Sequence, residues 1–198
     1  FLHRLCGSVE LRLNRCRRSC EALYRLYSAP PGLEELRRLL PYRGSGRYGL
    51  CLSHRTRRRV IKRLQDRRDK SQDHLFLAED SRFPLSQDLM VFVGEKLVCC
   101  KSNKAWSLFN GVFLTVASLR PLRMRDDETE EELEVPVEQF HRHLRSALAL
   151  TYYVCQARTL SDPPGTVVLY ETRHRKFSSR HLLVGLSRAA SVDKVSIA

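Results

Sequence analysis

The sequence lacks a long hydrophobic run. No apolar stretch approaches the roughly 20 residues that span a bilayer, which excludes a membrane-spanning protein, and no secretory signal peptide can be recognised at its start. The chain begins with Phe1 instead of Met. We therefore expect an intracellular polypeptide that is part of a longer chain.

Cysteine pairs with C-x-x-C spacing are also lacking. The seven cysteines include no C-x-x-C pair and their number is odd, which argues against a zinc site and against a disulfide framework. Cys16 and Cys20 lie one helical turn apart and could share a metal with Cys6 or His3, but unremarkable helix cysteines are the favoured interpretation. We expect reduced thiols, as in intracellular proteins, and no metal site.

The third absence concerns nucleotide chemistry. The sequence has no G-x-x-x-x-G-K-[ST] loop to hold phosphates and no acidic strand of the Walker B kind for magnesium. Gly44-Ser45-Gly46 is followed by neither Lys nor Ser/Thr and precedes a predicted strand instead of a helix. We therefore expect that this chain alone does not hydrolyse a nucleotide.

Positive charge is abundant. The 35 Lys and Arg residues against 22 Asp and Glu give a net charge of +13. Such a chain favours an anionic partner, either a nucleic acid or a membrane surface, and nucleic acid is the better choice here because no membrane segment is found. With 42% hydrophobic residues, the chain can form one substantial domain and a small one.

The hydrophobic pattern predicts helices first and then alternating strands and helices. Residues 1–45 are predicted to be a helical lead-in, with a break at Ala29-Pro30-Pro31-Gly32. The later segments are predicted as strand 48–53, helix 55–68, polar surface loop 69–87, short antiparallel strands within 88–136, strand 147–151, helix 154–160, strand 166–170, helix 178–189 and strand 194–197. This alternation is typical of an α/β protein with a parallel sheet flanked by helices.

In such sheets, ligands bind at the carboxyl ends of the strands. Three predicted strands end in polar or aromatic dipeptides, which are Ser53-His54, Thr151-Tyr152 and Tyr170-Glu171. The sequence therefore predicts a ligand site where these three ends meet.

One heptapeptide near the C-terminal end carries a specific resemblance. Leu183 to Ala189, LVGLSRA, resembles motif VI of superfamily 1 helicases, usually V-A-L-S-R. There an arginine meets the γ-phosphate of a nucleotide, since a planar guanidinium matches the charge that phosphoryl transfer spreads over oxygens. The resemblance implies that Arg188 is this catalytic arginine and that Ser187 caps or orients it. The alternative is an amphipathic helix with a merely solvated arginine.

Four further segments resemble the same family, in the required order. LCLSHRTRRRVIKRLQ, from Leu50, is similar to motif IV of RecD-like helicases, and Val91 to Leu119 is similar to the small barrel inserted in their second motor domain, with its Asn110-Gly111 turn. ALALTYYVCQARTL, from Ala147, resembles motif V, and TVVLY, from Thr166, resembles the strand between motifs V and VI.

The motif V segment departs from the family pattern. Its threonines and glutamine match at Thr151, Gln156 and Thr159, whereas Tyr153, Val154, Cys155 and Ala157 replace the expected His, Lys, Ser and Gly. These departures put the contact with the nucleic acid strand and its coupling to the nucleotide in doubt.

The resemblance implies an α/β fold, namely the second RecA-like domain of a helicase with an inserted small Src-homology-3-like β-barrel. Residues 46–87 and 137–198 would form the RecA-like domain, and residues 88–136 the barrel with an acidic hairpin. ATP and Mg2+ would be held mainly by an N-terminal RecA-like domain of the same protein, and the partner would be single-stranded nucleic acid, with DNA favoured over RNA, in DNA replication or repair.

The same resemblance, with charge and exposure, nominates further site residues. Those expected near the nucleotide, besides Arg188, are Gln156, Arg57, His54 and Ser187. Those expected near the nucleic acid are Thr151, Thr159, Arg158, Trp106, Arg173, Arg175 and Lys176. Trp106 could stack on a base or instead fill the core of the barrel, and the basic loop could equally be solvated.

Two other functions remain open from the sequence. A helicase-like module that has lost its motor would bind nucleic acid without catalysis. The acidic run Asp126 to Glu134 could serve a protein-interaction scaffold, although such a run is more often a solvated hairpin tip.

Overall fold

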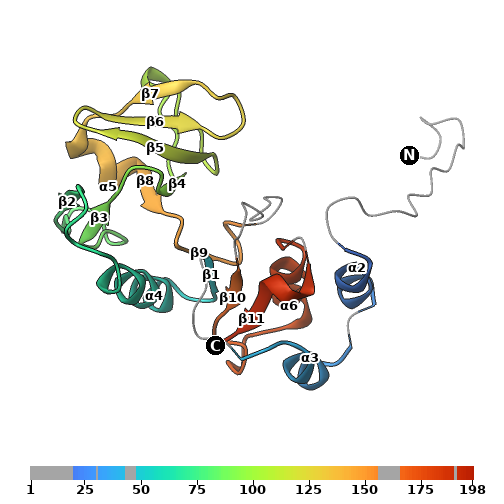
Figure 1. The fold of residues 1–198 in the computed structure, drawn as a ribbon. Helices are drawn as coiled ribbons and strands as arrows, with labels where there is room; N and C mark the ends of the chain where they lie inside the picture. The colour runs from blue at the N-terminus through green and yellow to red at the C-terminus, as the bar shows by residue number, and fades with distance from the viewer. Residues whose placement is uncertain (1–19, 30, 43–47, 156–165, 190) are drawn as a thin grey trace, which may run out of the picture.

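The computed structural model describes residues 20–29, 31–42, 48–155, 166–189 and 191–198. Two sheets dominate this part of the chain (Figure 1). Among its helices, none is long and apolar enough to span a membrane. The helices and short 3-10 turns are α2 (Glu21–Ser28), α3 (Leu33–Leu39), α4 (His54–Asp66), η1 (Lys104–Trp106), η2 (Val137–Gln139), α5 (Phe140–His143), α6 (Ser179–Leu186) and η3 (Val192–Lys194).

The first sheet is parallel throughout. Its strand order is β11-β10-β1-β9, and every neighbouring pair runs in the same direction. Its strands are β1 (Tyr48–Cys51), β9 (Ala149–Thr151), β10 (Val167–Leu169) and β11 (Val195–Ile197). The predicted alternation of strands and helices is therefore confirmed for these elements. The helix predicted over 154–160 lies almost wholly outside the described residues.

Both faces of this sheet are buried, which explains why its strands are apolar without interruption. On one face, Cys51 and Val168 pack with Val60 and Ile61 of α4. The opposite face packs against α2, α3 and α6. Leu50, Leu150, Leu169 and Val195 of the strands lie there in one cluster with Leu182 and Leu186 of α6. Figure 1 shows α4 and the group of α2, α3 and α6 on different sides of the parallel strands.

The second sheet is antiparallel, with the strand order β7-β6-β5-β4-β8. Its strands are β4 (Lys96–Cys99), β5 (Phe113–Leu119), β6 (Leu122–Asp126), β7 (Glu132–Glu134) and β8 (Leu144–Ser146). The last strand, β8, comes from beyond residue 136, the predicted end of the inserted barrel, and pairs with β4. Closure of this sheet into a Src-homology-3-like barrel remains a prediction, as do the domain boundaries.

Two turns of this sheet follow the sequence prediction. Gly111 has φ +87° in the Asn110-Gly111 turn between β4 and β5, a conformation that glycine adopts without strain. The acidic run forms the hairpin between β6 and β7. At that tip, Asp127 pairs with Lys96 at 2.8 Å and Glu130 with Arg125 at 3.2 Å, so some of its charge is compensated within the sheet.

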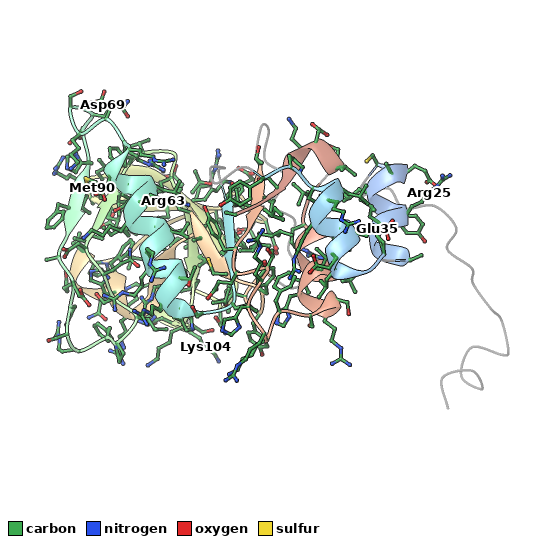
Figure 2. All side chains as sticks on the ribbon, turned by 90° about the horizontal axis from the view of Figure 1, so that it is seen from below. Arg25, Glu35, Arg63, Asp69, Met90 and Lys104 are labelled. Carbon is green, nitrogen blue, oxygen red and sulfur yellow. The ribbon has the colours of Figure 1, made fainter. Side chains whose placement is uncertain are left out.

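The prediction of a surface loop over residues 69–87 is wrong for its central part. β2 (Leu75–Leu77) forms an antiparallel pair with β3 (Leu89–Val91). Gln65 of α4 holds this pair in place, because its amide donates to the Met90 carbonyl at 2.8 Å and accepts from the Met90 N–H at 3.1 Å. Figure 2 shows Met90 beside α4. A buried glutamine can fix a short strand that has little sequence signal of its own.

The two sheets share one hydrophobic core. Phe140, at the start of α5, is fully buried in a cluster that contains Ile61 of α4, Val168 of β10 and Leu97 of β4. The face of the parallel sheet that meets α4 therefore belongs to the same core cluster as the antiparallel sheet.

Candidate functional site

The three predicted strand ends meet at one edge of the parallel sheet. The Tyr152 N–H donates to the Cys51 carbonyl at 3.1 Å, and the Tyr170 N–H donates to the Leu50 carbonyl at 2.9 Å. The residues that follow β1, β9 and β10 are thereby held side by side. This arrangement follows from the parallel pairing alone.

Glu171 occupies the centre of this edge. Its carboxylate accepts hydrogen bonds from the Leu52 N–H at 2.7 Å, the Ser53 N–H at 3.1 Å, the Ser53 hydroxyl at 3.0 Å and the Thr56 hydroxyl at 2.8 Å. Its backbone φ of +60° lies in the left-handed region that non-glycine residues rarely adopt. The N-terminus of α4 attracts anions, and this internal carboxylate already fills the position.

The charge state of Glu171 is set by these contacts. Burial would raise the pKa of its carboxyl group, but the hydrogen bonds from Thr56, from both groups of Ser53 and from Leu52 outweigh burial, and the pKa is lowered. The carboxylate therefore stays ionised at neutral pH and binds β10 to α4.

We expect Glu171→Gln to destabilise the fold by about 1–2 kcal/mol at pH 7, because a neutral amide loses charge-assisted hydrogen bonds. A carboxyl group whose folded pKa is lowered stabilises the fold above its unfolded pKa and loses that contribution as pH falls through the folded value. Urea unfolding at pH 7 and at pH 3 measures this. The gap between the two proteins should narrow at pH 3; an equal gap at both pH values would contradict the assignment.

Arg188 lies just beyond the C-terminal end of α6. It is only 7% exposed, and its Nε donates to the Val184 carbonyl at 3.3 Å while its Nη2 donates to the Ser187 hydroxyl at 2.9 Å. Burial raises the pKa of the Cys155 thiol to about 12, and the charge of Arg188 opposes this increase. The next residue, Ala189, lies in one buried cluster with Cys155 of the turn that follows β9, where the motif V resemblance falls.

An aromatic group joins that turn to α6. The ring of Tyr152 meets the rings of Phe177 and His181 edge-on, with centroids 5.7 and 5.5 Å apart, and Phe177 and His181 stack on each other. His181 also accepts from the Ser178 N–H at 3.1 Å in a capping box that begins α6. These contacts fix the helix that carries Arg188 relative to β9.

The residues predicted near the nucleotide are dispersed. His54 is exposed at the first position of α4, whereas Arg57 is 5% exposed and donates to the Leu85 carbonyl at 3.2 Å. Ser187 lies at the C-terminal end of α6 and accepts from Arg188. Gln156 lies outside the described residues.

The residues predicted near the nucleic acid form no single patch in the described part of the chain. Thr151 ends β9 and is 8% exposed. Arg158 and Thr159 lie outside the described residues. The exposed basic side chains between β10 and α6 are those of Arg173, Arg175 and Lys176.

Trp106 and Phe109 differ in their surroundings. Trp106 is half-buried against the shared core, with its ring edge-on to His143 at 5.5 Å. The side chain of Phe109 is 54% exposed. Of the two aromatic residues near this turn, Phe109 is thus the more accessible to a base.

No group of His, Cys, Asp and Glu in the described residues is arranged to hold a metal ion. Cys51 and Cys155 are buried free thiols, and Cys20 and Cys100 are exposed free thiols. The possible contribution of Cys6, Cys16 or His3 lies outside the described residues.

Comparisons with known proteins bear on the fold. No protein-family model matches the sequence, and no curated protein matches it closely enough to count as a relative. Solved structures of Pif1 helicases do match. A structure of two coordinating Pif1 helicases that unwind forked double-stranded DNA has a TM-score of 0.59 at 16% identity, over 92% of this chain and 48% of that chain.

Two further Pif1 structures are similar to this chain to the same degree. Pif1 from Bacteroides in complex with ADP-AlF3 and ssDNA has a TM-score of 0.59 at 15% identity, over 94% of this chain and 51% of that one. Pif1 from Candida albicans has a TM-score of 0.58 at 15% identity, over 89% and 52%. The chain thus spans about half the length of these helicases. Its α/β fold, with a parallel sheet flanked by helices, is similar to that part of the Pif1 structures, which confirms the predicted α/β class.

Sequence reasoning missed the structural role of Glu171 and the burial of Arg57. Glu171 was expected only as a polar residue at a strand end, because its partner Ser53 lies 118 residues away. The left-handed backbone at Glu171 leaves no signal in the sequence, since glycine or asparagine is usual there.

Proposed function

We propose that this chain is the second RecA-like domain of an ATP-dependent helicase of superfamily 1, RecD-like type, acting on single-stranded DNA. The main support for this proposal is the position of Arg188. It is held at the end of α6, beside the turn after β9, in a Pif1-like fold. A Pif1 structure of this fold contains both ADP-AlF3 and ssDNA, which supports ATP and a DNA strand as ligands.

In the proposed mechanism, ATP and Mg2+ bind mainly to an N-terminal RecA-like domain of the same protein. Closure of the two domains brings Arg188 to the γ-phosphate, where its permanent charge stabilises the transition state. Ser187 orients the guanidinium. Closing and opening then move a single strand stepwise across both domains.

The DNA-binding part of the proposal predicts a salt-dependent affinity. Replacing Arg173, Arg175 and Lys176 together with glutamine should weaken binding to an oligothymidylate. It should reduce the slope of log affinity against log salt by up to about 2, since each strand phosphate neutralised contributes about 0.7. Fluorescence anisotropy between 50 and 300 mM NaCl measures the slope.

The matched control removes the same charge elsewhere. Arg25, Arg82 and Arg120 are exposed and pair with Glu21, Asp80 and Asp73, so their replacement by glutamine should leave the slope nearly unchanged. If both triple variants lower the slope equally, the basic loop between β10 and α6 is not a strand contact.

A second candidate function is a helicase-like module that binds nucleic acid without hydrolysis. This function is favoured by the departure of the sequence from the motif V pattern. Cys155 replaces the expected serine there, and its thiol is buried, so this position offers no accessible polar group. Strand binding without strand-stimulated ATP hydrolysis is its signature.

A further inference from the structure

At the junction of the two sheets, two arginines line one small recess. Arg57 comes from the first turn of α4 and Arg145 from the middle of β8. The volume of the recess is about 10 Å³, which is room for about one oxygen atom the size of a water molecule. The recess is also lined by Leu85, Gln87, Phe140 and His141.

Both guanidinium groups have unused donors. Arg57 donates through Nη2 to the Leu85 carbonyl at 3.2 Å, and Arg145 donates through Nη1 to the carbonyls of Leu144, at 2.6 Å, and His141. The Nε atoms of both arginines are buried without a hydrogen-bond partner, and so is the Oε1 of Gln87, an acceptor that lines the same recess. Buried N–H groups without an acceptor are rare in native proteins and call for one.

The charge in the recess is also uncompensated. Burial, and then the charge of Arg145, lower the pKa of Arg57 to about 10, and the other groups acting on it are Arg58 and the thiols of Cys51 and Cys100. Burial also lowers the pKa of Arg145. Among the described residues, no carboxylate contributes to the pKa shift of either arginine.

The carboxylates that interact with residues lining the recess have other partners. Glu95 accepts from the Ser146 hydroxyl at 3.2 Å and pairs with Arg68 at 3.6 Å. Asp80 and Asp88 act on His141, but Asp80 is paired with Arg82 at 2.7 Å and Asp88 accepts from the Glu79 N–H at 2.8 Å. A buried positive charge, Arg57, and a half-buried one, Arg145, therefore lie together at the sheet junction, which is costly unless an anion joins them.

We propose that Arg57 and Arg145 form a phosphate site, in which one phosphate oxygen enters the recess and accepts hydrogen bonds from the guanidinium groups. Arginine suits this role because it stays charged and offers several N–H donors in one plane. The size of the recess fits a single oxygen, with the rest of the phosphate at the surface.

The phosphate belongs either to a nucleic acid backbone or to a nucleotide. Only this assignment of the source rests on the proposed function.

The site itself is tested with inorganic phosphate on the wild-type protein, Arg145→Gln and Arg57→Gln. Glutamine keeps an amide donor for the neighbouring carbonyls but removes the charge. Arg142→Gln is the matched control, because Arg142 is exposed and three residues from Arg145.

The melting temperature is measured in phosphate and in chloride at equal ionic strength. Phosphate should raise it in the wild type and Arg142→Gln, and should have less than half that effect in Arg145→Gln and Arg57→Gln. Equal phosphate effects in all four proteins would overturn the proposal. Should Arg57→Gln fail to fold, Arg145→Gln still decides the question, because Arg145 is only partly buried.

The source of the phosphate is then assigned with oligothymidylate and ATP. A tenfold weaker affinity of Arg145→Gln for the oligonucleotide, with the salt slope reduced by about 0.7, identifies a strand phosphate. The same loss for ATP alone identifies a nucleotide phosphate. If the wild type binds the oligonucleotide but neither affinity changes in Arg145→Gln, the site is wrong and the proposed function stands. If the wild type shows the phosphate effect but binds no strand, the proposed strand-binding function fails and the site stands.

Discussion

Replacing Arg188 with alanine is expected to lower strand-stimulated ATP hydrolysis by about 10³-fold or more, because a transition-state arginine contributes about 10³–10⁵ to the rate of phosphoryl transfer. Affinity for single-stranded DNA should change little. Steady-state hydrolysis with and without an oligonucleotide, on the full-length protein, measures both effects.

Two companion variants separate chemistry from folding. Arg188→Lys keeps the charge but not the planar pair of donors, so it should also be strongly impaired. Arg180→Ala removes an exposed arginine from the same helix and should retain nearly full activity. A fall in hydrolysis of less than tenfold in Arg188→Ala would exclude Arg188 as the transition-state arginine.

Replacing Phe140 with alanine is expected to cost about 3–5 kcal/mol of stability, the range for a fully buried phenylalanine. The effect should be global, because Phe140 lies in the cluster that contains Ile61 of α4 and Leu97 of β4. Urea unfolding monitored by circular dichroism should show one transition shifted to lower urea.

The control for this prediction is Phe109→Ala, at a position that is 54% exposed, where a change within about 0.5 kcal/mol is expected. A second, separate transition in Phe140→Ala would show instead that the two sheets unfold independently and do not share a core.

The parallel sheet could be predicted because its strands are buried on both faces. Val167 to Leu169 and Leu50 to Leu52 are uninterrupted apolar runs. Thr166 precedes the first run and Ser53 follows the second. A run of this kind has no alternative position in a water-soluble fold. The parallel direction then brings the strand ends together, so that Ser53 and Glu171 meet as neighbours.

Other features depend on partners distant in the sequence, which no local pattern reveals. β2 is stabilised by pairing with β3, which Gln65 of α4 holds through the Met90 backbone. Arg57 has the appearance of a solvated helix arginine in the sequence, yet it is buried because β8 and the Leu85 loop cover it. Helical spacing places a side chain on a face of its helix, but the burial of that face is decided elsewhere in the chain.

Strand-stimulated ATP hydrolysis by the wild-type full-length protein is the decisive test of whether this chain is part of a working motor. We expect slow ATP hydrolysis by the protein without DNA and a severalfold or larger increase when single-stranded DNA is added. Tight strand binding without any ATP turnover would instead identify a helicase fold that serves only to bind nucleic acid.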